Sequence, residues 1–116
     1  MLNTLIQQFR TAIINDYQSL EKGDSEAGNR YAKEVIRLHH DILKFGEEGK
    51  SALISLVDDE NVFIRAKAAF YSLPYVPEKA EKLLKQISNE PGFVGFISKQ
   101  AVDNWKKGVF KNIEEL

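Results

Sequence analysis

Cysteine is absent from the 116 residues, so the chain can form no disulfide, no thiolate nucleophile and no thiolate metal site. This absence fits a reducing compartment. The chain also lacks the run of about 20 apolar residues that a membrane-spanning helix needs. Its start, MLNTLIQQFR, has neither the basic residues nor the unbroken apolar run of a secretory signal. We therefore expect a cytoplasmic protein that has no membrane segment.

A strong charge of one sign is also missing. The 16 basic and 17 acidic residues give a formal net charge of −1, which does not support a general affinity for nucleic acid or anionic membranes. Hydrophobic residues make up 43% and charged residues 28% of the chain, as in an ordinary globular protein. At this length we expect one domain, residues 1–116, with its own hydrophobic core.

Apolar residues recur at three- and four-residue steps along most of the chain, which is the spacing of amphipathic helices. The first stripe runs from Leu2 to Leu20 and ends at Gly23, after which Asp24 or Ser25 can cap the next helix. Gly46 and Gly49 are expected to bracket the end of this second helix. No stretch shows the sustained alternation of a strand. The fold class is therefore all-α, with six helices in three antiparallel pairs. They are expected at about 2–22, 25–45, 50–57, 62–72, 77–87 and 93–107.

The last two helix pairs show a repeat. An offset of 32 residues (64 to 96) relates Ile64, Ala69 and Leu73 to Phe96, Ala101 and Trp105. A period in this range is typical of solenoid proteins, in which a terminal pair often differs from the others. The side chains expected to be buried in the last helix are Phe93, Ile97, Ala101 and Trp105.

Residues 53–73 resemble a HEAT repeat. A leucine-rich helix leads through an acidic turn to the pair Ile64-Arg65, followed by Ala68-Ala69 and Leu73. The resemblance implies an α-α superhelix, a right-handed HEAT-like solenoid. Alanines there would let two helix backbones approach closely, and Arg65 could reach back to the acidic turn. The chain also resembles a small family of bacterial HEAT-like domains of unknown function, which is similar to immunity proteins of toxin systems.

No group of residues has the spacing of a catalytic or metal site. His39 and His40 are neighbours that point about 100° apart on a helix, so they cannot hold one metal ion together. We expect His39 to be a hydrogen-bonded core residue and His40 to be exposed. The acidic run at 58–61 lacks the pattern of a calcium loop, and the glycines lack a phosphate-binding spacing. We expect no metal, no cofactor and no enzymatic activity.

Antiparallel pairing places the loops after the first, third and fifth helices at one edge of the stack. This acidic edge contains Glu21, Asp24, Asp58, Asp59, Glu60 and Glu90. Two interpretations remain open: these side chains cap the helices that follow, or they form a docking surface for a basic protein. A basic group is better explained as a solvated face near a helix C-terminus; it consists of Lys99, Lys106, Lys107 and Lys111.

These patterns favour a monomeric protein-binding module. Its most concrete form is an immunity or inhibitor protein that binds and neutralises a cognate toxin, for example a nuclease whose basic cleft meets the acidic edge. The alternatives are a nucleic-acid-binding helical repeat, which the modest lysine count disfavours, and a scaffold subunit of a larger complex. A helical repeat presents two faces and two edges, and the sequence does not choose among them.

Overall fold

The computed structural model describes residues 1–110 and 112–116, and this part of the chain is all-helical, without a strand. The prediction of an all-α protein with six helices is confirmed. The helices are α1 (Leu2–Lys22), α2 (Ser25–Leu43), α3 (Glu47–Ser55), α4 (Val62–Ser72), α5 (Pro77–Ile87) and α6 (Gly92–Lys106), with two 3-10 turns, η1 (Leu56–Asp58) and η2 (Ile113–Glu115). In the described residues, none of these helices combines the length and hydropathy that crossing a bilayer requires.

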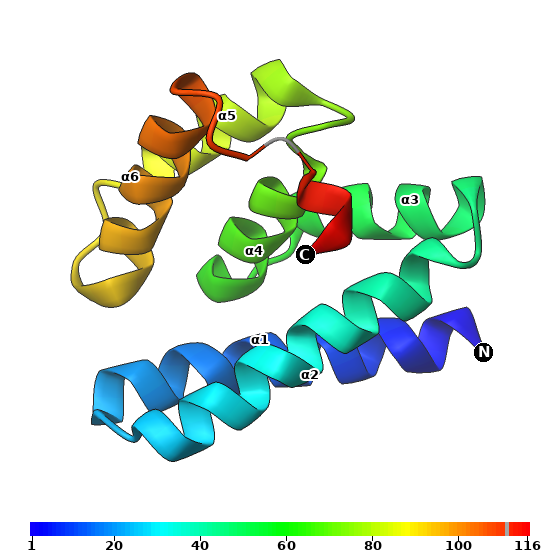
Figure 1. Ribbon diagram of the computed structural model, residues 1–116, viewed down its shortest axis with the longest axis horizontal. Coiled ribbons are helices and arrows are strands. Elements are labelled where there is room, and N and C mark those ends of the chain that lie inside the picture. The colour runs from blue at the N-terminus through cyan, green and yellow to red at the C-terminus, as the bar shows by residue number, and fades with distance from the viewer. Residues whose placement is uncertain (111) are drawn as a thin grey trace.

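Helices α1 and α2 form a long antiparallel hairpin along one side of the molecule (Figure 1). Gly23 turns the chain between them with a φ of 72°, which other residues rarely adopt. The carboxylate of Asp24 then accepts a hydrogen bond of 3.0 Å from the N–H of Ala27 and so caps α2. Both predicted roles in this turn are confirmed.

Helices α3 to α6 lie on the other side of the hairpin, with α4 at their centre (Figure 1). Helix α4 contacts α1, α3, α5 and α6. Ala68 and Ala69 are fully buried, which is the result predicted for small side chains that let neighbouring helices come close. Asn61 begins the helix by accepting hydrogen bonds from the N–H groups of Phe63 and Ile64, at 2.9 and 3.2 Å.

Helix α3 begins at Glu47, before the predicted start near residue 50. Gly49 was expected to mark the end of the previous helix, but it lies inside α3 and is buried. A Cβ at this position would collide with the backbone carbonyl oxygen of Ile42. Glycine is therefore needed at position 49 because α3 comes close to the end of α2. The conformation of a turn does not require it.

Helix α6 is rotated relative to the prediction. Phe93 was expected to be buried but is 44% exposed, whereas Ala101 is buried and Ile97 and Trp105 are half-buried. Only one side of an amphipathic helix can face the core, and here that side contains Val94, Gly95, Ser98, Ala101 and Val102.

The predicted 32-residue correspondence is therefore wrong at Phe96, which is 58% exposed where Ile64 is fully buried. The buried residue Val94 matches Ile64 in position instead, at an offset of 30 (64 to 94), and the buried Ser98 matches Ala68 at the same offset. Chain spacing alone did not distinguish the two registers, because both put apolar residues at helical steps.

The C-terminal segment returns across α4 and reaches α2 (Figure 1). The ring of Phe110 meets that of Phe70 edge to face at 5.1 Å, and Ile113 is 2% exposed. The hydroxyl of Tyr71 donates a hydrogen bond of 3.1 Å to the carbonyl of Leu116. Phe110 and Ile113 thus pack on the core, while the side chain of Val109 is exposed.

Candidate functional site

The carboxylates predicted to form an acidic edge have different surroundings. Asp24 is exposed and caps α2, as described above. Glu21 is also exposed, and its Oε1 lies 3.8 Å from the position that a Cβ of Gly92 would occupy. The end of α1 therefore lies close to the start of α6. Glu90, two residues before Gly92, is exposed as well, so Glu21 and Glu90 belong to the same end of the molecule.

Asp59 is held by interactions within the fold. Its two carboxylate oxygens accept hydrogen bonds of 2.9 and 3.2 Å from Arg10 of α1, and Oδ1 also accepts one of 2.9 Å from the N–H of Asn61. The side-chain hydrogen bond with Arg10 is the main cause that holds the pKa of Asp59 below its ordinary value. For Asp59, a structural role thus accounts for the carboxylate.

Arg65 stabilises the same turn from the other side. Its Nη1 donates hydrogen bonds to the carbonyls of Asp59 and Glu60, at 3.0 and 2.9 Å, so the reach predicted for this residue is confirmed. The side chains of Asp58 and Glu60 are exposed. Asp58 forms only a long pair of 3.7 Å with the exposed Lys79, a kind of contact that contributes little to stability.

The acidic residues fall into two groups. Asp59 contacts Arg10, whereas Glu21 lies 11 residues (10 to 21) further along α1. At 1.5 Å per residue this is a separation of roughly 16 Å along the helix axis. One acidic group is thus the turn at 58–60, and the other consists of Glu21 and Glu90.

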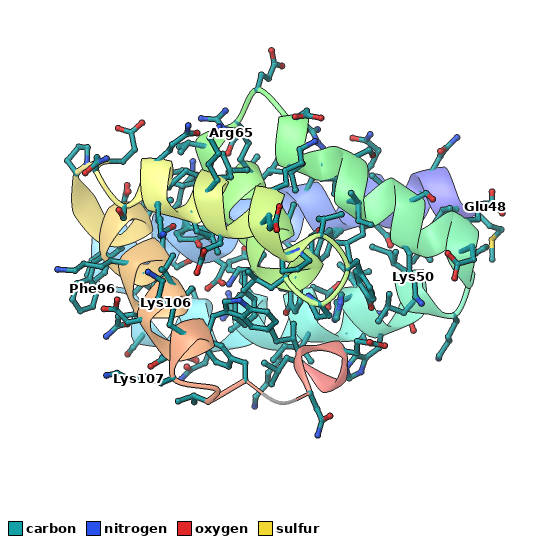
Figure 2. The ribbon with its side chains drawn as sticks, turned by 90° about the horizontal axis from the view of Figure 1, so that it is seen from above. Glu48, Lys50, Arg65, Phe96, Lys106 and Lys107 are labelled. Atoms are coloured by element: carbon teal, nitrogen blue, oxygen red, sulfur yellow. The ribbon has the colours of Figure 1, made fainter. Side chains whose placement is uncertain are left out.

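Two phenylalanines lie beside the second acidic group and were missed as surface residues by the sequence analysis. Phe93 and Phe96 are 44% and 58% exposed and stand one helical turn apart on α6, so they share a face. Together with Gly92 they line a shallow apolar hollow. Figure 2 shows Phe96 at one end of the molecule, away from the packed helices. We call Phe93, Phe96 and Gly92, with Glu21 and Glu90, the aromatic–acidic patch.

The sequence contains a signal for this patch, but an ambiguous one. Helix α6 has two overlapping apolar stripes, one through Phe93 and Phe96 and one through Val94 and Ala101. Periodicity shows that α6 has such stripes but does not tell which one faces the core. The choice is made by the surface that α4 and α5 offer to α6.

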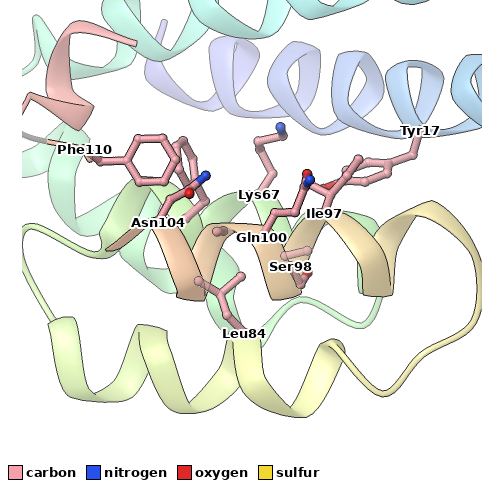
Figure 3. Close-up of a pocket in the computed structure, with 11 residues that line it drawn as sticks. Tyr17, Lys67, Leu84, Ile97, Ser98, Gln100, Asn104 and Phe110 are labelled. Atoms are coloured by element: carbon pink, nitrogen blue, oxygen red, sulfur yellow. The ribbon is translucent and has the colours of Figure 1, made fainter. Parts of the chain in front are cut away.

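A pocket of about 190 Å³ lies between α1, α4 and α6, and the C-terminal segment borders it (Figure 3). The rings of Tyr17 and Phe110 stand at opposite ends. Its polar lining comes from α4 and α6 and consists of Lys67, Ser98, Gln100 and Asn104. Its apolar lining includes Ala66, Phe70, Leu84, Ile97 and Ala101. Sequence reasoning missed this pocket, because its members come from five segments of the chain.

Two opposite charges, Asp16 and Lys67, influence each other beside this pocket. Asp16 of α1 is 8% exposed, and burial raises the pKa of its carboxyl while the charge of Lys67 opposes that shift. Burial likewise lowers the pKa of Lys67, and Asp16 opposes this. The ammonium of Lys67 lies 5.5 Å from the centroid of the Tyr17 ring, within the range of a cation–π interaction.

His39 lies in the core as predicted. Its hydrogen bonding and the exposure of His40 differ from the prediction. His39 is fully buried, yet neither ring nitrogen has a well-formed hydrogen bond with a described residue. His40 is partly buried and interacts with other residues, so it is less exposed than predicted. Among the described residues, no three His, Cys, Asp or Glu side chains are grouped as metal ligands would be.

The predicted basic group lies on and beyond α6. Lys99, Lys106 and Lys107 are exposed, and the last two lie at the C-terminal end of the helix (Figure 2). Positive charge at this end is favoured by the helix dipole. Lys111 lies outside the described residues.

Comparison with known proteins identifies the fold alone. The crystal structure of the protein RPA1889 from Rhodopseudomonas palustris CGA009 superposes on this chain with a TM-score of 0.83. The match covers 95% of this chain and 92% of that protein, at 21% sequence identity. No protein-family model matches the chain, and no curated protein matches it.

Proposed function

We propose that this chain is a non-enzymatic, HEAT-like protein-binding module, and most concretely an immunity or inhibitor protein that neutralises a basic toxin. The observation that carries the proposal is the aromatic–acidic patch. Exposed Phe93 and Phe96 are costly to leave in water, and they lie at the same end of the molecule as the exposed Glu21 and Glu90. An apolar centre with a charged rim is the usual anatomy of a protein interface.

The charge of the rim suggests the character of the partner. Glu21 and Glu90 are exposed, as are Asp58 and Glu60 in the other acidic group. Carboxylates that are not fixed by the fold are available to steer a basic partner and to select it over others. A toxin that cleaves nucleic acid has such a basic surface, which is why we favour an inhibitor of this kind.

The HEAT-like superhelix remains part of the proposal. It is supported by the position of Arg65, which binds the carbonyls of the turn before its helix, and by the burial of Ala68, Ala69 and Ala101. In such a scaffold, successive helix pairs hold a rigid surface whose shape changes little when a partner binds.

Binding to the patch is tested by affinity. The partner is first isolated from the native host by cross-linking and mass spectrometry, and its Kd is then measured against purified variants. We expect the double variant Phe93→Ala, Phe96→Ala to weaken binding about 100-fold or more, as loss of two hot-spot aromatics does. Ile36→Ala is the matched control, because Ile36 is an exposed apolar residue of α2, at 39%.

The role of the acidic rim in binding and the inhibitory action of the chain need separate measurements. Glu21→Lys with Glu90→Lys should slow association and reduce its salt dependence, since rim charges act mainly on the association rate. Expression of the partner alone should arrest growth, and co-expression of this chain should restore it. If the double phenylalanine variant binds like the wild type, the patch is not the interface. If the partner is harmless, the inhibitory role fails although binding stands.

A further inference from the structure

A lysine of α4, Lys67, lines the pocket between α1, α4 and α6. Lys67 is the only charged side chain among the described residues that line it. Its ammonium makes no hydrogen bond or direct ion pair with a described residue and interacts only with the face of Tyr17, at 5.5 Å, and through space with Asp16. An anion that bound there would accept charge-assisted hydrogen bonds from this ammonium.

Further polar groups gather around the same space. The hydroxyl of Ser98 is buried with its residue 1% exposed, lines the pocket and has no hydrogen-bond partner in the described part of the chain. The amides of Gln100 and Asn104 lie one helical turn apart on α6, on the side of the pocket toward which Lys67 extends (Figure 3). Buried polar groups in a folded protein are normally satisfied, so the unpaired hydroxyl of Ser98 points to a ligand.

The remaining lining is apolar and small. Tyr17 and Phe110 stand at opposite ends (Figure 3), and Ile97 and Ala101 of α6 also line the pocket. The volume of about 190 Å³ is close to that of a cavity that holds benzene, roughly 150 Å³. The apolar part of a ligand would therefore be about the size of one six-membered ring.

From this geometry we infer that the pocket binds a small organic acid, a carboxylate joined to one ring-sized apolar group. The carboxylate is recognised by Lys67 together with the amides of Gln100 and Asn104, and the ring packs between Tyr17 and Phe110. This ligand site is separate from the aromatic–acidic patch, because the two are formed by different side chains of α6.

Asp16 should affect ligand binding in the opposite direction from Lys67. It is buried near Lys67 but does not line the pocket, and each of the two charges affects the other. Its negative charge therefore competes with the carboxylate of a ligand for the same ammonium. Removing the charge of Lys67 should weaken binding, while removing the charge of Asp16 should strengthen it.

The test compares an acid with its neutral counterpart on the unmodified protein. Binding of 3-phenylpropionate and of 3-phenylpropanamide is measured by NMR titration of the backbone amides. We expect the acid to bind at least about tenfold more tightly than the amide, a difference of about 1.4 kcal/mol, with shifts centred on α4, α6 and residue 110. The same titration is made with a peptide that ends in a free phenylalanine and with its C-terminal amide. This comparison tells whether the acid is a free metabolite or a chain terminus.

Variants assign the effect to the pocket. Lys67→Met should remove the preference for the acid, Asp16→Asn should increase affinity for it about threefold or more, and Ala101→Leu should block both ligands by filling the space. Lys99→Met is the matched control, because Lys99 is exposed on α6 and outside the pocket. The inference is overturned if the wild type binds the acid and the amide equally well. It is also overturned if neither 3-phenylpropionate nor the peptide that ends in a free phenylalanine binds. Because this comparison needs no variant, poor folding of a mutant does not affect it.

Discussion

The imidazole of His39 in α2 lies flat against the phenol ring of Tyr71 in α4, with ring centroids 3.8 Å apart and planes 18° apart. Tyr71 in turn donates a hydrogen bond to the carbonyl of Leu116 at the end of the chain. One stack thus joins the α1–α2 hairpin, the central helix and the C-terminal segment. The burial of His39 makes this junction sensitive to acid.

Burial is the main cause that lowers the pKa of His39 from 6.5 to about 4, and the neighbouring His40 lowers it further. Between pH 6.5 and about 4 the unfolded chain therefore binds more protons than the folded chain, so the free energy of unfolding falls as the pH falls through this window. The loss amounts to at most about 3 kcal/mol. Urea unfolding between pH 7.5 and 4 measures it. His39→Phe should flatten this slope, whereas His40→Gln should keep most of it. An unchanged slope in His39→Phe would falsify the assignment.

The C-terminal segment should contribute to stability through Ile113, whose side chain is 2% exposed. Ile113→Ala deletes buried methyl groups and leaves a cavity, so we expect a loss of about 3 kcal/mol in the free energy of unfolding. Val109→Ala is the control, since Val109 is 59% exposed and lies in the same segment. Denaturant unfolding should place the control within about 0.5 kcal/mol of the wild type. Equal effects of the two substitutions would show that the segment does not pack as described.

Two buried glycines should respond to alanine with opposite signs. At Gly49 a Cβ collides with the carbonyl oxygen of Ile42, which is backbone and cannot swing away, so Gly49→Ala should destabilise by about 2 kcal/mol. At Gly28, in helix α2, a Cβ would make an ordinary contact of 3.8 Å with Ser19. Gly28→Ala should therefore stabilise by about 0.5–1 kcal/mol, because alanine favours the helix and restricts the unfolded chain. Thermal unfolding of both variants checks the signs.

Substitutions of the neighbouring residues Asp58 and Asp59 should change the free energy of unfolding by very different amounts. Asp59→Ala breaks bonds to Arg10 and to the N–H of Asn61, and we expect a loss of about 2 kcal/mol. Asp58→Ala removes only a long exposed contact with Lys79 and should cost less than about 0.5 kcal/mol.

A double-mutant cycle of Asp59→Ala with Arg10→Met isolates the ion pair and should give a coupling of about 1 kcal/mol. Because the folded pKa of Asp59 lies below its ordinary value of 3.8, this contribution is present above that pH. It is lost as the pH falls through the folded pKa. A coupling of zero would mean that the hydrogen bonds to Arg10 do not stabilise the fold.

Local sequence signals predicted much of the fold. Gly23 and Asp24 marked the first turn, and the limits of α4 were predicted to the residue. These features depend on short-range chemistry, namely a left-handed glycine, a side-chain cap and an apolar period, and each is complete within a few residues. The start of α3 was missed because Gly49 looked like a helix terminator, although it is needed for contact with another helix.

By itself, the sequence determined that this protein is a cysteine-free set of six helices with caps and turns in defined places, since helix formation follows from local spacing. Only the tertiary structure decided that Phe93 and Phe96 face water, that Asp59 is held by Arg10, and that Lys67, Ser98, Gln100 and Asn104 line one pocket. The physical reason is that these relations depend on how each helix is rotated against its neighbours. That rotation is set by the packing of the whole core, and no short stretch of the chain contains it.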